Sequence, residues 1–267
     1  MKIENDKYYT SSQLAKYCVR KTKEIIGENN ISEYIEPSAG SGVFLDFLDN
    51  NYKAYDIEPE DNRIIQRDYL TLELGYLKNR CIIGNPPYGT NTLVTQFYNK
   101  SIELGDYIAF ILPISQLDNN YQLFKFDLIY SEDLGLKEYS NIKLHCCFNV
   151  YKRPIGEKLN KRPNYKLKDV ELKEYRRNEK DIPLDFNYDI GICSFGNGII
   201  GRITNHKNQY CKEIYFKIHN DNIKDKVLNL IKETDWEKEV CKGISGQNNL
   251  SMWRVYKYIK EQISEIE

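Results

Sequence analysis

The alternation of short apolar stretches with helix-like stretches through residues 31–150 constrains the fold of this chain more than any other feature. The apolar stretches are rich in β-branched residues and nearly continuous, which is typical of strands buried on both faces. Such strands, joined by helices, form a mostly parallel sheet covered on both sides. We therefore predict an α/β fold with strands at 31–35, 52–57, 63–66, 81–84, 107–112 and 142–150, and helices at about 43–48 and 91–104.

This alternation breaks after residue 150. Between Lys152 and Lys180 the chain holds 11 Lys/Arg against 5 Asp/Glu, together with prolines. We predict a domain over residues 1–153, a basic linker over 154–182 and a small α+β domain over 183–267. The second domain is expected to have strands at 189–195, 199–203 and 213–218, and helices at 223–232 and about 250–263.

Composition excludes several classes of protein. The 7 cysteines form no Cys-x-x-Cys pair and the 3 histidines complete no zinc spacing, so we predict no metal site. Scattered thiols are typical of a reducing compartment. The sequence shows no signal peptide and no apolar run long enough to cross a membrane. We expect a cytoplasmic protein.

A glycine-rich loop at residues 36–42 follows the first predicted strand. It lacks the third glycine of the dinucleotide fingerprint and the Gly-Lys-Ser/Thr of a phosphate loop. Asp56 closes the second strand, where a carboxylate can accept both hydroxyls of a ribose. Asp68 closes the third and can accept from an adenine amino group. Each acid alone is more often a cap or turn residue, but in this order the three features outline a site for an adenosine-containing ligand.

The tetrapeptide Asn85-Pro86-Pro87-Tyr88 follows the buried strand at 81–84. Proline fixes its own φ and restricts the residue before it, so the Asn85 side chain and the Pro86 carbonyl are held in place. Two fixed acceptors suit a planar exocyclic amine, which is a poor nucleophile until its nitrogen pyramidalises. The acceptors also stabilise the positive charge that develops on that nitrogen. Alone, the tetrapeptide could be a rigid surface turn, but the ordered signals before it favour a catalytic role.

These motifs resemble those of the amino-methylating DNA methyltransferases of restriction–modification systems. The likeness is to the adenine-N6 enzymes, in which an N-terminal motif and the donor loop precede the Asn-Pro-Pro-Tyr motif. A weaker match upstream has Ser11 where the family more often has proline. The similarity covers roughly residues 8–153, and its matching segments are Tyr8-Tyr9-Thr10-Ser11, Glu36 to Gly42, Tyr55-Asp56-Ile57-Glu58-Pro59, Arg67-Asp68-Tyr69-Leu70 and Asn85-Pro86-Pro87-Tyr88-Gly89.

The resemblance implies a Rossmann-like methyltransferase sheet, S-adenosylmethionine as methyl donor, and site-specific DNA-methyltransferase (adenine-specific) activity. It implies that the transfer is carried out by Asn85, Pro86, Pro87 and Tyr88. It places the donor against Tyr9, Thr10, Glu36, Ser38, Ala39, Gly40, Asp56, Ile57, Asp68, Tyr69 and Asn85. It places the flipped base among Tyr88, Phe97, Phe148 and Tyr151.

The resemblance also implies double-stranded DNA as a partner, with a cognate restriction endonuclease as a further candidate. The predicted C-terminal domain would be the target-recognition domain, and the basic segment would contact phosphates. A solvated surface segment is the alternative for that stretch. The candidate base-reading residues, each of which could equally be a solvated loop residue, are Asn197, Arg202, Asn205, His206, Lys207, Gln247 and Asn248. Monomer and dimer both stay open.

Several alternatives share the Asn-Pro-Pro-Tyr turn. Methyltransferases acting on RNA adenine and on protein glutamine use it too, whereas cytosine-N4 enzymes more typically have Ser-Pro-Pro-Tyr. A non-enzymatic alternative is a DNA-binding specificity subunit that kept the fold. Such a subunit would be expected to have lost the donor loop or the catalytic turn, and both are intact here.

Overall fold

The computed structural model describes residues 9–49, 51–89, 91–139, 142–156, 158–176, 186–241 and 248–267. The chain divides into two compact units, Met1–Pro163 and Asn164–Glu267. Each unit has its own sheet and its own apolar core. No helix among the described residues has both the length and the apolar character that a membrane span requires.

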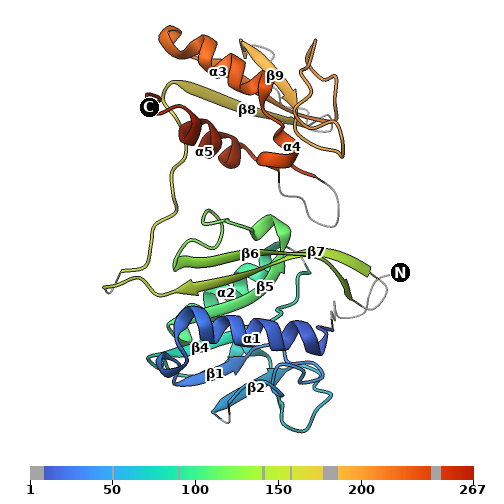
Figure 1. Cartoon of the computed structure of the whole chain (residues 1–267), viewed down its shortest axis with the longest axis vertical. Coiled ribbons are helices and arrows are strands. Elements are labelled where there is room, and N and C mark those ends of the chain that lie inside the picture. The colour runs from blue at the N-terminus through green and yellow to red at the C-terminus, as the bar shows by residue number, and fades with distance from the viewer. Residues whose placement is uncertain are drawn as a thin grey trace. The chain divides into compact units, whose positions relative to one another are not determined.

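The first unit is built on a seven-stranded sheet of order β3-β2-β1-β4-β5-β7-β6 (Figure 1). The first five strands in that order are parallel, whereas β7 runs antiparallel to both β5 and β6. The predicted Rossmann-like α/β sheet is therefore confirmed. The strands are β1 (Glu33–Glu36), β2 (Tyr52–Asp56), β3 (Ile65–Gln66), β4 (Arg80–Gly84), β5 (Tyr107–Pro113), β6 (Asp127–Tyr139) and β7 (Ile142–Lys152).

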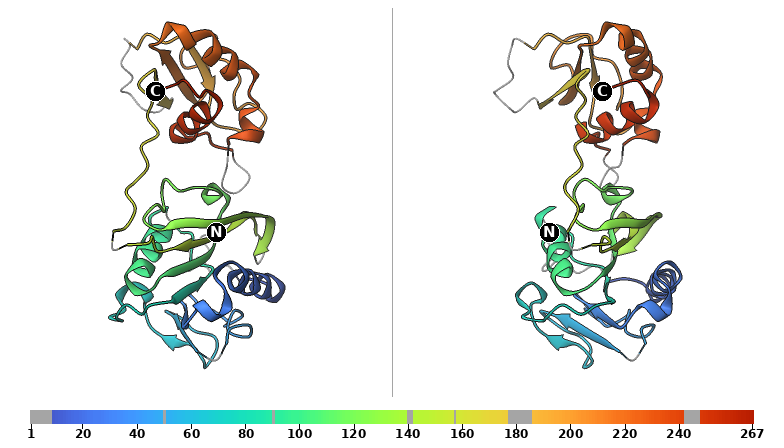
Figure 2. Two further views of the ribbon diagram at one scale, coloured as in Figure 1. Left: turned by 60° about the vertical axis from the view of Figure 1, so that its left-hand side comes forward. Right: turned by 90° about the vertical axis from the view of Figure 1, so that its left-hand side faces the viewer.

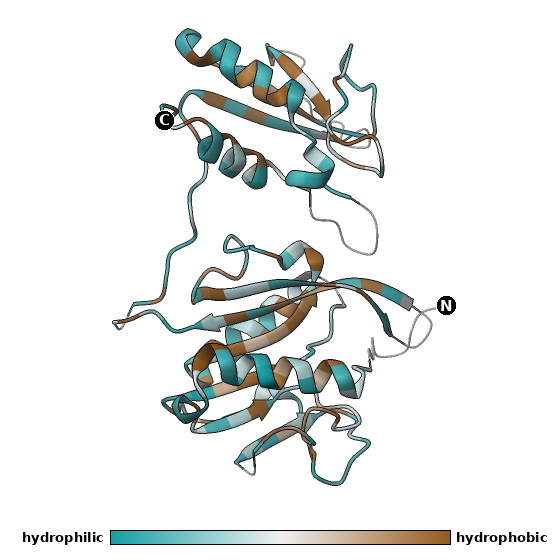
Figure 3. Cartoon of the chain, viewed as in Figure 1, coloured by the Kyte–Doolittle hydropathy of each residue, from teal (hydrophilic) through white to brown (hydrophobic). Residues whose placement is uncertain are grey.

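Helices cover both faces of this sheet, α1 (Ser12–Ile26) on one side and α2 (Asn91–Leu104) on the other (Figure 2). Successive side chains of a strand point to opposite faces. In β4, for example, Ile83 packs in the core under α1 and Ile82 in the core under α2. Apolar and polar residues alternate along helix α1 in Figure 3, because its apolar residues recur at helical spacing and form one buried stripe.

The helix predicted at 43–48 is wrong. The segment forms consecutive turns, in which Leu45 N–H donates to the Gly42 carbonyl and Phe47 N–H to the Phe44 carbonyl. These bonds span three residues, not the four of an α-helix. Gly40 and Gly42 have φ of +51° and +78°, which turns the backbone out of the right-handed helical region just where a helix would have to nucleate.

The second unit has a three-stranded antiparallel sheet of order β8-β10-β9, packed against helices. Its first strand, β8, lies inside the range predicted as linker. The strand predicted at 199–203 is wrong: the segment forms turns, because Gly198 and Gly201 have φ of +70° and +83°. The elements are β8 (Val170–Arg176), β9 (Ile190–Cys193), β10 (Lys212–Ile218), α3 (Asp221–Glu233), α4 (Trp236–Glu239) and α5 (Met252–Gln262).

Candidate functional site

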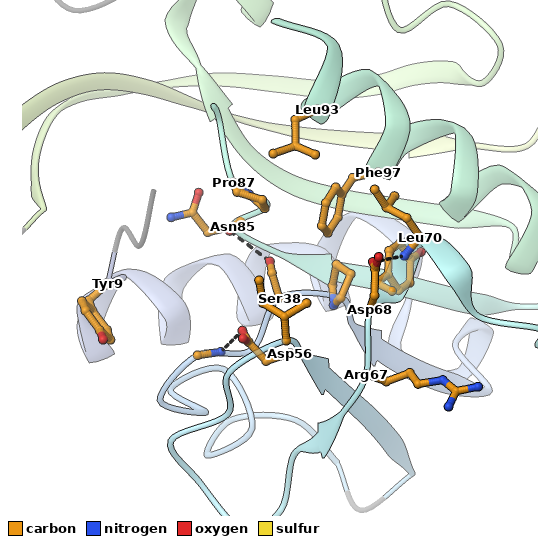
Figure 4. Close-up of a pocket in the computed structure, with 14 residues that line it drawn as sticks. Tyr9, Ser38, Asp56, Arg67, Asp68, Leu70, Asn85, Pro87, Leu93 and Phe97 are labelled. Carbon is orange, nitrogen blue, oxygen red and sulfur yellow. Dashed lines mark hydrogen bonds between the residues drawn. The ribbon is translucent and has the colours of Figure 1, made fainter. Parts of the chain in front are cut away.

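A cavity of about 300 Å³ opens at the carboxyl edge of the parallel strands in the first unit (Figure 4). Its walls come from the loops that follow β1, β2, β3 and β4, and from α2. In an open parallel sheet this edge is where ligands bind. The lining residues are Tyr9, Pro37, Ser38, Gly40, Asp56, Ile57, Arg67, Asp68, Tyr69, Leu70, Asn85, Pro87, Leu93 and Phe97.

Asp56 is fixed at the end of β2 by two backbone donors. Gly40 N–H donates to its Oδ2 at 2.7 Å, and Glu58 N–H donates to its Oδ1 at 2.8 Å. The first bond ties the glycine-rich loop after β1 to the end of β2. Each carboxylate oxygen can accept a second hydrogen bond, so Asp56 can still receive hydroxyl donors from a ligand in the cavity.

Glu36, the last residue of β1, is a buried carboxyl group beside this loop, 2 % exposed. Its Oε2 has no hydrogen-bond partner among the described residues. Burial, and secondarily the negative charge of Asp56, raise the pKa of Glu36 well above its usual range, and Arg63 offsets only part of this. Glu36 also lines a smaller cavity of about 40 Å³, next to Thr10, Ser38 and Asn85. A positively charged ligand in this cavity would offset the free-energy cost of ionising the buried Glu36 carboxyl group.

Glu33, at the opposite end of the same strand, is buried in the reverse situation. It accepts from Arg80 Nε at 2.6 Å and from Lys53 Nζ at 2.7 Å. Burial alone would raise the pKa of Glu33, but these two cationic partners lower it. The strand therefore carries a satisfied, structural carboxylate at its amino end and an unsatisfied one at the edge that holds the cavity.

The far end of the cavity is formed by Asp68 and Tyr69. Asp68 is exposed and caps a short 3₁₀ turn, its Oδ1 accepting from Leu70 N–H at 2.9 Å. Tyr69 is buried, shares a hydrogen bond with Ser101 Oγ and stacks on Phe97 with ring centroids 5.4 Å apart. Its ring is thus part of an aromatic wall. Ile57 is 56 % exposed, an apolar side chain standing over the cavity.

The Asn-Pro-Pro-Tyr turn meets the donor loop at Asn85. The Asn85 Nδ2 donates to Thr10 Oγ1 at 3.2 Å, and Ser38 Oγ donates to the Asn85 backbone carbonyl at 3.3 Å. Ser11, the departure from the family pattern, caps α1 by accepting from Leu14 N–H. Serine is a good N-cap, so the substitution is accommodated by the helix start. Tyr8 lies outside the described residues.

The structure does not bring the four predicted base-pocket aromatics together. Phe97 lines the cavity, and Tyr88 is half-buried with its hydroxyl 3.7 Å from Cys146 Sγ. Phe148 and Tyr151 are both fully buried, in the cores on opposite faces of the sheet. They sit three residues apart on β7, and side chains an odd number of positions apart in a strand point to opposite faces. Neither ring lines the cavity.

The candidate base readers of the second unit are partly used within the protein. Asn248 N–H donates to Asn197 Oδ1, and Asn248 Nδ2 donates to Glu237 Oε1 at 2.5 Å, so these two asparagines hold loops together. Arg202, Asn205 and His206 are exposed, whereas the Lys207 ammonium lies 5.5 Å from the centre of the Tyr188 ring. Gln247 lies outside the described residues.

Comparison with known proteins adds only a distant likeness. No protein-family model and no curated protein matches the sequence. Three similar solved structures are a candidate RNA methyltransferase from Pyrococcus horikoshii, the 23S rRNA methyltransferase ErmE, and magnesium protoporphyrin IX methyltransferase from Synechocystis PCC 6803 with bound S-adenosylmethionine.

Their sequence identities to this chain are 14%, 10% and 9%, in that order, and their TM-scores are 0.47, 0.40 and 0.38. The matches cover 58%, 56% and 57% of this chain and 90%, 70% and 88% of the other chains. At TM-scores below 0.5 these likenesses carry no functional argument. The residues of the site have to carry it.

Proposed function

We propose that this protein transfers a methyl group from S-adenosylmethionine to the N6 amine of an adenine flipped out of double-stranded DNA. One observation carries the proposal. The rigid Asn85-Pro86-Pro87-Tyr88 turn at the end of β4 contributes to the same cavity as Asp56 and Asp68, the two acids suited to a nucleoside. An amine acceptor site and an adenosine site are thereby combined in one cavity.

The residues of the cavity fit the proposed donor. The buried Glu36 carboxyl group, whose Oε2 lacks a partner among the described residues, suits a ligand with an ammonium group such as the methionine end of the donor. Asp56 would accept the ribose hydroxyls, and Asp68 the adenine amine. Ile57 and the Tyr69–Phe97 wall would enclose the adenine ring. When bound, the donor supplies an electrophilic methyl group on a sulfonium centre.

The protein's own contribution to the transfer is orientation and charge stabilisation. The Asn85 amide oxygen and the Pro86 carbonyl would accept the two N–H groups of the target amine, so that its nitrogen lone pair turns towards the methyl group. Tyr88 would stack on the base, which must leave the duplex to enter the site. No general base is required, because the proton can pass to water after the transfer.

Exposed cations near the end of β7 support a nucleic-acid partner. Lys152, Lys158 and Lys161 are all exposed. Arg162 lies over the rings of Tyr121 and Phe124, at 5.4 and 5.2 Å from their centres. Lysine side chains of this kind contact backbone phosphates without reading sequence. Sequence reading would fall to the second unit as target-recognition domain. RNA adenine and protein glutamine are the competing acceptors.

The proposal is tested by offering the purified protein labelled S-adenosylmethionine with duplex DNA, single-stranded DNA, ribosomal RNA and release factor in parallel. DNA from expressing cells is also read by methylation-sensitive long-read sequencing. We expect N6-methyladenine in one sequence context. Label appearing only in RNA or protein would overturn the choice of DNA, and label in none of the four would contradict the proposed activity.

The Asn85→Ala variant tests the role given to the catalytic turn. It should lose transfer by a factor of at least about 100, as expected when a transition-state acceptor is removed, while donor affinity stays within a few-fold. The matched control is Asn30→Ala, since the Asn30 amide donates to the Ile26 carbonyl outside the cavity. Transfer by Asn85→Ala at the rate of the control would disprove the acceptor role.

A further inference from the structure

The 40 Å³ cavity beside the glycine-rich loop is lined by one acidic residue, Glu36, and otherwise by uncharged residues. Glu36 is 2 % exposed, and its Oε2 has no hydrogen-bond partner among the described residues. A Cβ at Gly84 would lie 3.4 Å from Glu36 Cγ and 3.8 Å from its Oε1, so the end of β4 covers the carboxyl group. Tyr9 is the other titratable residue of the lining, and its hydroxyl donates to Glu60 Oε1. A negative charge on Glu36 would therefore stand in an uncharged space away from bulk water.

Two charged groups beyond the lining act on Glu36 in opposite directions. Asp56, at the end of the neighbouring strand β2, disfavours the ionised form of Glu36, whereas Arg63 favours it. The Arg63 guanidinium is already shared by Asp61 Oδ2 at 2.7 Å and Asp46 Oδ1 at 2.9 Å. Burial, and secondarily Asp56, outweigh Arg63, so the pKa of Glu36 lies well above its usual range.

An ammonium group that enters this cavity reverses the situation of Glu36. A lone charge is costly in such a space, whereas two opposite charges in contact compensate each other. A cation within about 4–6 Å favours the ionised form of a carboxyl group. The O–H bond of the carboxyl group then breaks and its proton passes to water, while the ammonium group keeps all its hydrogens. The cavity is thus neutral both before and after the ligand enters.

We infer that Glu36 holds a proton in the ligand-free protein and releases it to solvent when it pairs with the ammonium group of a bound ligand. The inference rests on the proposed function for the identity of that ligand, an amino acid linked to adenosine. It makes Glu36 a specificity-determining residue for the amino acid end. One proton leaves for each such ligand bound, whereas a ligand with the adenosine alone leaves the proton in place.

The test is calorimetric titration of the full chain in buffers of different ionisation enthalpy. The two probes are S-adenosylhomocysteine and methylthioadenosine, which has the adenosine part and lacks the amino acid part. At about pH 6.5 an α-amino group, whose ordinary pKa is about 7.7–8.0, carries its positive charge. The dependence of the binding enthalpy on the buffer should correspond to about one released proton for S-adenosylhomocysteine and to none for methylthioadenosine.

The Glu36→Gln variant removes the titrating group and keeps the shape of the side chain. Wild-type affinity for S-adenosylhomocysteine should rise about 10-fold for each step of one in pH from 5 to 7, because one proton is released. Affinity of Glu36→Gln should change by less than about threefold over that range, and its binding should release no proton. The matched control is Glu33→Gln, the same change at a glutamate that pairs with Arg80 outside the cavity. This control should release the proton as wild type does.

A second measurement needs no ligand. The infrared carbonyl band of a protonated carboxyl group should be present in ligand-free wild type near neutral pH and absent from Glu36→Gln. Absence of this band from wild type overturns the inference, whatever the protein methylates. Its presence in a protein that binds no S-adenosylhomocysteine would show that Glu36 holds the proton and that the proposed donor, and the release with it, is wrong.

Two results of the calorimetry overturn the inference and leave the proposed methyl transfer standing. One is binding of S-adenosylhomocysteine to wild type with an enthalpy that is the same in every buffer. The other is proton release that persists in Glu36→Gln, because another group would then be its source.

Discussion

The two glutamates at the ends of β1 should affect the pH dependence of the unfolding free energy in opposite directions, and Glu36→Gln is the sharper test. Burial and the charge of Asp56 raise the pKa of Glu36 well above its ordinary value of 4.5. The folded protein therefore keeps this proton at pH values where the unfolded chain has lost it. The contribution of Glu36 is fully present below pH 4.5 and is lost as the pH rises towards the folded value.

The size of this effect on the unfolding free energy is set by the single proton that Glu36 keeps in the folded state. Between the unfolded and folded pKa values, each unit of pH lowers the unfolding free energy of the wild type by about 1.4 kcal/mol relative to a variant without the proton. For a domain the size of the first unit, this free-energy change corresponds to a shift in melting temperature of roughly 3–5 °C for each step of one in pH. Glu36→Gln should accordingly melt higher than wild type near neutral pH, by a margin that grows from pH 5 upward.

The assay is thermal unfolding of ligand-free protein at pH 5, 6, 7 and 8, followed by circular dichroism, with Glu33→Gln as the comparison. The pKa of Glu33 is lowered by Lys53 and Arg80 against the effect of burial, so its stabilisation exists above pH 4.5 and is lost in acid. Glu33→Gln should thus melt lower than wild type by a nearly constant margin at all four pH values, because its stabilisation is lost only below pH 4.5. If the difference in melting temperature between wild type and Glu36→Gln is instead the same at all four pH values, Glu36 is not the buried, proton-retaining group described.

Glu36→Gln should also bind S-adenosylmethionine more weakly, because the ammonium group of the donor loses its counter-charge.

Two further predictions concern packing and partner binding. A Cβ at Gly105 would lie 2.5 Å from the Arg80 carbonyl oxygen, so Gly105→Ala should lower the unfolding free energy measured by urea denaturation by about 1–3 kcal/mol. Gly75 has open space around it, and Gly75→Ala should change that free energy by no more than about 0.5 kcal/mol. Equal effects of the two substitutions would refute the steric argument. Replacing Lys152, Lys158 and Lys161 together by Gln should reduce the slope of log affinity for duplex DNA against log salt by up to about 3, and an unchanged slope would show that these lysines do not contact phosphates.

Prediction of the fold from sequence succeeded where burial dominates. The apolar strands at 81–84 and 107–112 and the helix at 91–104 are confirmed, because a continuous apolar run or a helical apolar spacing has few alternatives. Strand β6 was missed because it lies at the sheet edge and mixes charged with apolar side chains. Strand β8 was not predicted because its many charged residues are typical of a linker. Val170 and Leu172 nevertheless alternate with half-exposed neighbours, as in a half-buried strand.

For the candidate site, the order of motifs predicted which loops meet, because the ends of parallel strands share one edge. Asp56, Asp68 and Asn85 are expected at a common cavity for this reason, and all three line it in the structure. The sequence does not reveal Glu60, which accepts a side-chain hydrogen bond from Tyr9 across 51 positions of the chain. Nor could it tell which aromatics of β7 face the core, since Phe148 and Tyr151 both read as apolar members of one strand.

The adjacency of β1 and β4 at the centre of the sheet has an evolutionary consequence. The strand order turns between them, so the loops proposed to hold the nucleoside follow β1, β2 and β3, whereas the turn proposed to hold the amine follows β4. The two halves are separate stretches of chain that can mutate independently. If the proposed roles are right, substitutions after β4 can change which planar nitrogen is recognised and leave the loops after β1, β2 and β3 unchanged. Such a division would allow the acceptor specificity of the proposed methyltransferase to change while the donor site is conserved.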